Sequence, residues 1–132
     1  MTTAHGSFKV AGGTEDPYDE LDGGTKLTHA SGTQAFSGDI TGEGAVHWLM
    51  LYRADKTAHF VGLQQITGSV GGRTGSFVAA AEGDHDGTGS TITFSIIPDS
   101  GTGELAGITG DGSLDAKGGP SGTYELNYTL ES

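Results

Sequence analysis

The sequence predicts an all-β protein, namely a small antiparallel β-barrel with little helix. Its 25 glycines are spread among threonine, β-branched and aromatic residues instead of forming a linker, which is typical of strands. No window holds apolar residues at helical spacing for more than a turn or two. Glycine inside strands marks bulges and sharp coiling, which a small closed barrel needs. Residues 36–97 carry most of this signal.

Length and composition limit the other classes. The 132 residues suit a single domain over residues 1–132, and a chain without cysteine has neither disulfides nor thiol nucleophiles. The net charge of −11, from 17 acidic and 6 basic side chains, repels phosphate backbones, so we expect no nucleic-acid partner. The longest apolar stretch, residues 45–52, is far shorter than the roughly 20 residues of a spanning helix. The first residues lack a secretory signal, and we expect a cytoplasmic bacterial protein with no membrane partner.

Three connections set the expected strand register. Gly71-Gly72 is a two-residue hairpin turn, and residues 54–57 link two further strands. Asp86-Gly87 is a candidate type I′ turn, because both positions tolerate positive φ. The expected opposite pairs are Val70 with Arg73, Ile66 with Phe77, Gln64 with Ala79, Met50 with Phe60, His85 with Thr88, Ala81 with Ile92, Ala79 with Phe94 and Phe77 with Ile96.

The flanking segments complete the expected elements. A first strand is expected around residues 7–11, and a polar loop follows at residues 16–24. Residues 98–107 are expected to be irregular, with one helical turn at residues 103–106. Later strands are expected near residues 110–114 and at residues 124–130.

This register sorts the bulky apolar residues onto one face, which we assign to the barrel interior. The interior face carries Trp48, Met50, Tyr52, Phe60, Ile66, Phe77, Ile92, Phe94 and Ile96. The opposite face is polar at its ends and aliphatic in the middle, with a patch made of Leu49, Leu51, Val61, Leu63 and Val78. Exposed apolar patches mark interfaces, so we expect a homo-oligomer. Local cover by the amino-terminal segment or by the loop at Pro98 is the alternative.

Polar groups on the interior face are the candidate ligand-orienting residues. Gln64, Trp48 and Tyr52 need partners there, because an unpaired buried amide or indole costs about 1 to 3 kcal/mol. Tyr124 and Tyr128 join them if the last strand turns its aromatic side chains inward. Gln64 suits recognition of a ligand carbonyl or hydroxyl, and it suits equally a hydrogen bond to a tyrosine across the barrel.

Acid–base candidates lie mainly on the other face. Glu43 and His47 share it with His59 and Glu82, and only a reversed assignment gathers them inside the barrel for proton transfer near neutral pH. Gln64 and Tyr52 complete the catalytic candidates. The two histidines do not form an opposed pair, and the acidic turns lack the ligand ladder of calcium loops, so no metal site is predicted.

Two glycine-containing segments resemble a known family. Residues 100–112, SGTGELAGITGDG, resemble the signature of allene oxide cyclase and dirigent barrels, in which a glycine pair, an apolar residue and a further glycine precede a strand. Residues 36–40 resemble the start of a barrel strand there, and residues 6–130 resemble a bacterial single-domain family of unknown function that shares this barrel. The resemblance implies an eight-stranded, often oligomeric barrel whose hydrophobic cavity supports ring closure without a cofactor. No residue matches the catalytic residues of those enzymes.

Three functions remain open from the sequence. The first is a cofactor-free cyclase or isomerase that folds a polyene, fatty-acid or polyketide-like substrate, so that apolar walls give conformation and proximity gives rate. The second is a non-catalytic binding or carrier protein for a small apolar ligand, and the third is a filled barrel whose outer patch binds another protein. The expected walls and orienting groups of the pocket are Trp48, Met50, Tyr52, Phe60, Gln64, Phe77, Phe94, Tyr124 and Tyr128.

Overall fold

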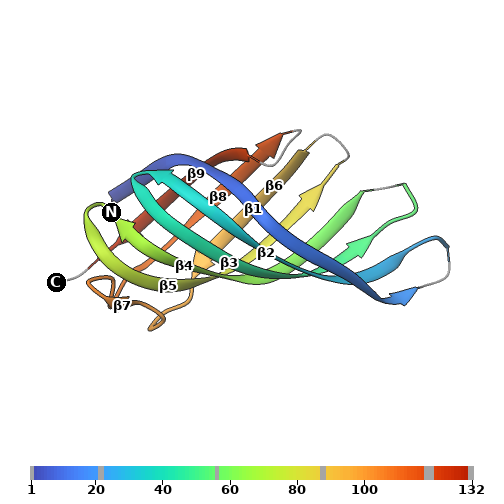
Figure 1. Ribbon diagram of the computed structural model, residues 1–132, viewed down its shortest axis with the longest axis horizontal. Coiled ribbons are helices and arrows are strands. Elements are labelled where there is room, and N and C mark those ends of the chain that lie inside the picture. The colour runs from blue at the N-terminus through green and yellow to red at the C-terminus, as the bar shows by residue number, and fades with distance from the viewer. Residues whose placement is uncertain (1, 21–22, 56, 87–88, 118–120, 131–132) are drawn as a thin grey trace.

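The computed structural model describes residues 2–20, 23–55, 57–86, 89–117 and 121–130, whose strands close into a barrel (Figure 1). The strands are β1 (Thr2–Glu20), β2 (Lys26–Gly38), β3 (Ile40–Tyr52), β4 (Ala58–Val70), β5 (Arg73–His85), β6 (Gly89–Ile96), β7 (Thr102–Gly103), β8 (Thr109–Lys117) and β9 (Ser121–Thr129).

The predicted eight-stranded antiparallel barrel is confirmed. Pairing runs from β1 through β2, β3, β4, β5, β6, β8 and β9 back to β1, and the two-residue β7 pairs with β5 beyond the end of β6. The described residues contain no helix, and therefore none that is long and apolar enough to cross a membrane.

Two of the three expected connections are confirmed. Strands β4 and β5 pair Val70 with Arg73 and keep that register along the hairpin. Strands β3 and β4 pair Met50 with Phe60, as the short link between them predicts.

The third connection is a correction, because His85 pairs with Ser90 and not with Thr88. The Asp86 N–H donates to the Gly89 carbonyl over 3.1 Å, and the Gly89 N–H donates to the Asp86 carboxylate over 3.0 Å. These bonds place the centre of the hairpin one residue later than a two-residue Asp86-Gly87 turn would. The expected turn residue Gly87 itself lies outside the described residues. The pairs are shifted by two residues, so each side chain keeps its face: Ala81 pairs with Phe94, Ala79 with Ile96 and Gly83 with Ile92.

Strand β1 is much longer than the sequence predicts, and the expected loop from Asp16 lies within it. Beyond the pair of Lys9 with Ser121, β2 is the only described strand that pairs with β1. An edge strand has no neighbour that needs the missing N–H of Pro17. Acidic side chains and two register shifts are features that keep such an edge from pairing with other chains.

The last third of the chain follows the expected order with longer strands. Strands β8 and β9 begin before the expected residues 110 and 124. Between β7 and β8, the Leu105 N–H donates to the Thr102 carbonyl and the Ala106 N–H donates to the Gly103 carbonyl, which makes the expected single turn.

The predicted assignment of faces is confirmed, and the core is concentrated at the end of the barrel that holds both termini (Figure 1). There, Ile40, Val70, Phe77, Ile108 and Leu126 are almost completely buried. Along the predicted interior face, Phe60, Ile66, Ile92, Phe94 and Ile96 are buried, whereas Trp48 and Met50 pack against the core while partly exposed. Side chains therefore fill one end of the barrel and leave the other end open.

Candidate functional site

A cavity of about 310 Å³ lies at the open end of the barrel. It is formed mainly by the inner faces of β1, β2 and β3, where β1 has passed the start of β9. Val10 marks the opening, because its side chain points along the inner face and is still 42 % exposed. The lining residues are Val10, Gly13, Thr14, Glu15, Ala30, Ser31, Gly32, Thr33, Gln34, Val46 and Trp48.

Apolar side chains form one wall of this cavity. Val46 is buried, and Trp48 meets the Phe60 ring edge to face, with 4.9 Å between ring centroids. Ala30 lies opposite Trp48 on the neighbouring strand, so a small side chain keeps the space in front of the indole free. This packing fixes the indole from one side.

Two glutamine side chains meet behind the cavity lining. Gln64 Nε2 donates a hydrogen bond to Gln34 Oε1, and Gln64 is fully buried. The other amide atom, Gln64 Oε1, is buried without a hydrogen-bond partner among the described residues. Gly44 makes room for the pair, since a Cβ there would lie 3.2 Å from Gln34 Oε1 and 2.8 Å from the Phe36 ring. An unpaired buried amide oxygen is rare in proteins and marks a place for a donor.

A carboxylate at the mouth accepts a hydrogen bond from a buried hydroxyl group. Thr28 is only 1 % exposed and its Oγ1 donates to Glu15 Oε2 over 2.6 Å. Burial, a hydrogen bond to Glu15 and the charge of Glu15 raise the pKa of Tyr52 to about 12. The Tyr52 hydroxyl donates to the Met50 sulfur over 3.7 Å.

The sequence does not predict Glu15 as a site residue, because the first expected strand covers only residues 7–11 and a bulge between Val10 and Gly12 turns Glu15 inward. The available signal was the glycine pair Gly23-Gly24, which favours a turn. In the structure Glu20 pairs with Lys26, so β1 extends through Glu15. Among the described lining residues of the cavity, Glu15 alone is charged.

The predicted pocket residues separate into two groups. Trp48 lines the cavity, Met50 and Tyr52 are partly buried beside it, and Phe60 and Gln64 are buried next to its lining. The remaining four lie among the buried core residues: Phe77, Phe94, Tyr124 and Tyr128.

The Tyr124 hydroxyl is occupied by the backbone at the corner between β2 and β3. It accepts from the Ile40 N–H over 2.8 Å and donates to the Ser37 carbonyl over 2.7 Å. Burial raises the pKa of Tyr124; the bond from Ile40 opposes this and the negative charge of Asp39 adds to it. Its role in the structure is therefore to tie two strands together.

Glu43 and His47 lie outside the barrel, as the face assignment predicts. Glu43 is opposite Thr67, and the His47 ring stacks on His29 with centroids 5.4 Å apart. His29 Nε2 and His47 Nδ1 are 3.2 Å apart, and the sequence does not predict this contact. Over the described ranges, no three His, Cys, Asp or Glu side chains are grouped to hold a metal ion.

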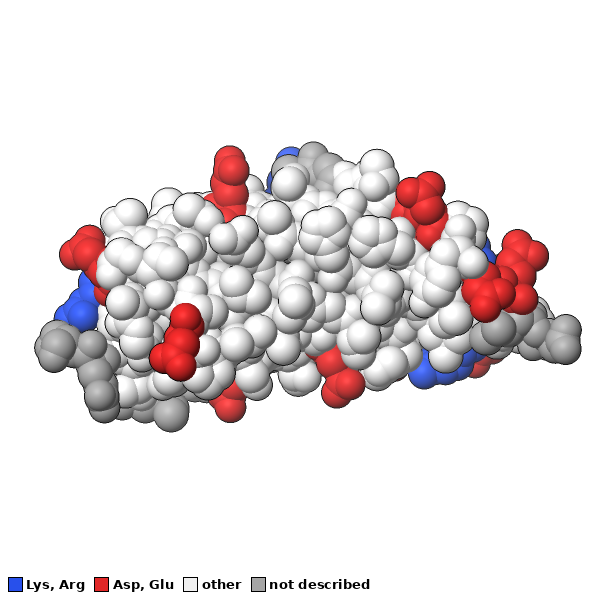
Figure 2. Space-filling model, turned by 90° about the horizontal axis from the view of Figure 1, so that it is seen from below, with Lys and Arg blue, Asp and Glu red and all other residues white. Residues whose placement is uncertain are grey.

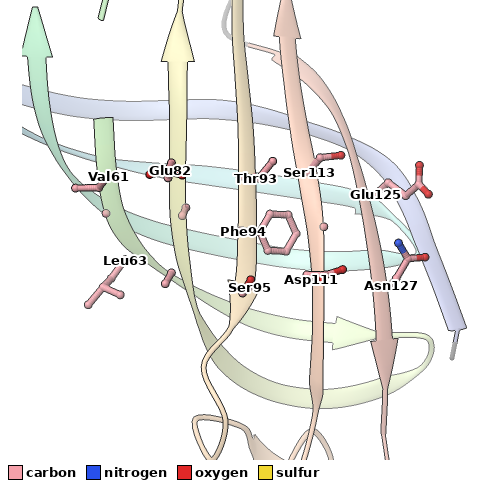
Figure 3. A pocket seen from close by; sticks show the side chains of 14 residues that line it. Val61, Leu63, Glu82, Thr93, Phe94, Ser95, Asp111, Ser113, Glu125 and Asn127 are labelled. Carbon is pink, nitrogen blue, oxygen red and sulfur yellow. The ribbon is translucent and has the colours of Figure 1, made fainter. Parts of the chain in front are cut away.

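A second, larger hollow of about 920 Å³ lies on the outer surface of β4, β5, β6, β8 and β9 (Figure 3). Val61 and Leu63 border it on one side, and Glu125 and Asn127 on the other. Ala80 is among the small side chains between them. Carboxylates and hydroxyl groups account for most of its labelled side chains, so it lacks the apolar enclosure of the barrel mouth.

Three residues of the predicted outer patch are exposed, whereas Leu51 and Val78 are half-buried. Leu49 and Leu63 are each 53 % exposed and Val61 is 41 % exposed. The loop at Pro98 covers only the end of the patch, where Ser100 Oγ bonds the Val78 backbone. Figure 2 shows one face of the molecule with a broad uncharged middle and scattered acidic side chains.

Fold and cavity together define a closed eight-stranded β-barrel that is filled at one end and open at the other. The chain belongs to the DUF3224 family of proteins of unknown function, whose model matches residues 4–128. It is similar to the crystal structure of a DUF3224 protein with unknown function from Shewanella oneidensis. That likeness has a TM-score of 0.80 and 26 % identity, and covers 100 % of this chain and 99 % of that chain. No curated protein matches this chain.

The family comparison confirms the coarser part of the predicted resemblance, a family of unknown function that shares this barrel. The likeness to allene oxide cyclase and dirigent barrels stays a prediction.

Proposed function

We propose that this protein binds a small, mainly apolar molecule in the cavity at the open end of the barrel. The observation that carries the proposal is the 310 Å³ cavity itself, which has Val46 and Trp48 in its walls and Glu15 and Gln34 among its polar lining residues. Ligand pockets commonly measure about 300 to 1,000 Å³ and combine apolar walls with a few fixed polar groups. The acid–base candidates Glu43 and His47 lie on the outer surface, which favours binding over catalysis by those residues.

Binding is tested with 1-octanol, an uncharged probe that is small enough for the cavity. Trp48 is the single tryptophan, so its emission reports on this wall alone. In the wild type, the Trp48 emission is expected to change saturably as 1-octanol is added. In Ala30→Leu, the larger side chain fills the space in front of the indole, and binding is expected to be lost. Ala80→Leu makes the same change in the outer hollow and is expected to bind normally. Absence of saturable binding, or loss in Ala80→Leu alone, contradicts the proposal.

A second candidate is the cofactor-independent isomerase or cyclase, and Glu15 is the specific observation in its favour. A carboxylate that accepts a hydrogen bond from Thr28 and lies beside an apolar wall suits removal of a proton from a bound carbonyl compound. The carboxylate would take a proton from the α-carbon of the ligand and return one to the same enolate. Polyene, fatty-acid or polyketide-like substrates remain the class that this reaction would serve.

The catalytic candidate is tested with 2-octanone in deuterium oxide, where NMR follows replacement of its α-protons. Exchange faster than in buffer is expected for the wild type and for Asp16→Asn, whose carboxylate lies one residue away on the same strand. Glu15→Gln is expected to exchange at the buffer rate. Equal rates for wild-type protein and buffer contradict the isomerase, while leaving the binding function untouched.

We also propose that the protein forms a homo-oligomer through the outer patch. Three aliphatic side chains there, Leu49, Val61 and Leu63, are 41 to 53 % exposed, and burying them between copies removes apolar surface from water.

A further inference from the structure

We propose that the cavity at the open end selects its ligand by head group and takes an apolar amine in preference to a carboxylic acid of the same size. This inference rests on the proposed binding function and adds the chemical class of the ligand. Four features of the cavity lead to it.

The first feature is the sign of the charge. Among the described residues that line the cavity, Glu15 is the only charged one. The basic residue Lys26 does not line the cavity; its Nζ stands 5.1 Å from the centre of the Tyr52 ring. An ammonium group is therefore attracted to the mouth, and a carboxylate is repelled.

The second feature is the fixed position of the carboxylate. The Thr28 hydroxyl, which is buried, donates to Glu15 Oε2. An ionised carboxylate accepts about four hydrogen bonds, so this donor leaves capacity for a ligand. Hydrogen bonds between ammonium and carboxylate groups are roughly twice as strong as neutral ones.

The third feature is aromatic. The Trp48 indole lines the same cavity as Glu15, and an ammonium group over an indole face gains about 0.5 to 2 kcal/mol. A carboxylate gains nothing from that face.

The fourth feature lies deeper. Gln34 lines the cavity, and behind it the buried Gln64 Oε1 lacks a partner among the described residues. Gln64 does not itself line the cavity, but as a carbonyl oxygen its Oε1 accepts and cannot donate, so it offers no hydrogen bond to an ionised acid. The whole chain adds to this preference, because its net charge is −11.

The test compares n-octylammonium, 1-octanol and octanoate, three eight-carbon molecules that differ in head group, by calorimetry at pH 7. Octylammonium is expected to bind at least about tenfold more tightly than octanoate, with octanol between them. In Glu15→Gln the difference between octylammonium and octanoate is expected to shrink about tenfold. Asp16→Asn is the control, because it removes the same charge from the outward side of β1. It is expected to leave most of the difference in affinity between octylammonium and octanoate.

The outcomes separate this inference from the function on which it rests. Binding of all three molecules with equal affinity, or tighter binding of octanoate, overturns the head-group preference while the cavity remains a ligand site. Lack of binding by all three overturns the cavity as a ligand site. A preference that persists unchanged in Glu15→Gln also overturns the inference, because it assigns the preference to charge elsewhere on the molecule.

Discussion

At the scale of single residues, the site depends on polar groups with fixed partners. The Glu15 carboxylate accepts from Thr28, the Tyr52 hydroxyl donates to Met50, and the Gln64 amide donates to Gln34. The sequence predicted Tyr52 and Gln64 from their place on the interior face. It did not predict Glu15, because that residue becomes an inner-face residue only after the bulge between Val10 and Gly12.

The interaction of Tyr52 with Glu15 makes a prediction about pH. The pKa of Tyr52 is raised from 10.0 to about 12, so folding holds its proton more tightly than the unfolded chain does. Stability from this group is complete below pH 10 and is lost as the pH rises through 12. Glu15→Gln removes the charge and is expected to lower the pKa of Tyr52. The absorbance of tyrosinate, taken as the difference between each protein and its Tyr52→Phe version, measures this; an unchanged pKa contradicts the assigned partner.

Tyr124 gives a prediction about stability. Tyr124→Phe removes the hydroxyl that joins the Ile40 N–H to the Ser37 carbonyl, and leaves a buried N–H without a side-chain acceptor. The expected loss is about 1 to 3 kcal/mol in the free energy of unfolding, measured by urea denaturation. Tyr18→Phe is the control, because Tyr18 is 57 % exposed and its loss is expected to be near zero. Equal effects of the two substitutions would show that the Tyr124 hydroxyl has no structural role.

At the scale of elements, the register is largely predictable, and the errors have local physical causes. The Gly71-Gly72 turn and the link from β3 to β4 fix their hairpins because a turn sets the pairing of its strands. The predicted pairing of His85 was wrong, because the Asp86 carboxylate accepts a hydrogen bond from the Gly89 N–H and the centre of the hairpin lies one residue later. The end of β1 was missed because proline and acidic residues are allowed on an unpaired edge, whereas they indicate loops elsewhere.

The close contact between β3 and β4 at Gly68 makes a prediction at this scale. A Cβ on Gly68 would lie 2.1 Å from the Thr41 carbonyl oxygen, and its φ is +153°. Gly68→Ala is therefore expected to destabilise the fold by more than about 1 kcal/mol, seen as a lower Tm. Gly72→Ala shares a positive φ of +87° but meets nothing within 4 Å, so its loss is expected to be smaller. The reverse order contradicts the close packing of these strands.

At the scale of the whole molecule, side chains fill the barrel at one end, and the other end is open. Its closed end is packed with core side chains, and its open end results from long hairpins that extend past β9. The sequence predicted the inner face but not this division, since the fill of a barrel depends on how strands of different length overlap. The cavity therefore lies at one end of the predicted interior and involves only part of the predicted set.

The outer patch makes a prediction about assembly. Light scattering in dilute buffer is expected to give a multiple of the 13.4 kDa chain mass for the wild type. Leu63→Glu places a charge in the patch and is expected to give the single-chain mass. Gln65→Glu adds the same charge two residues along the same exposed face and is expected to reduce assembly less. A wild-type mass of 13.4 kDa contradicts the proposed oligomer.

The claim that the open end of the barrel holds a ligand is tested most directly by the indole N–H resonance of Trp48. As the single tryptophan, it gives one resolved signal in a proton–nitrogen correlation spectrum. Titration with n-octylammonium is expected to shift this signal saturably in the wild type and in Ala80→Leu, and to leave it unmoved in Ala30→Leu. An unmoved signal in the wild type, at concentrations where calorimetry detects binding, would place the ligand elsewhere and contradict the account.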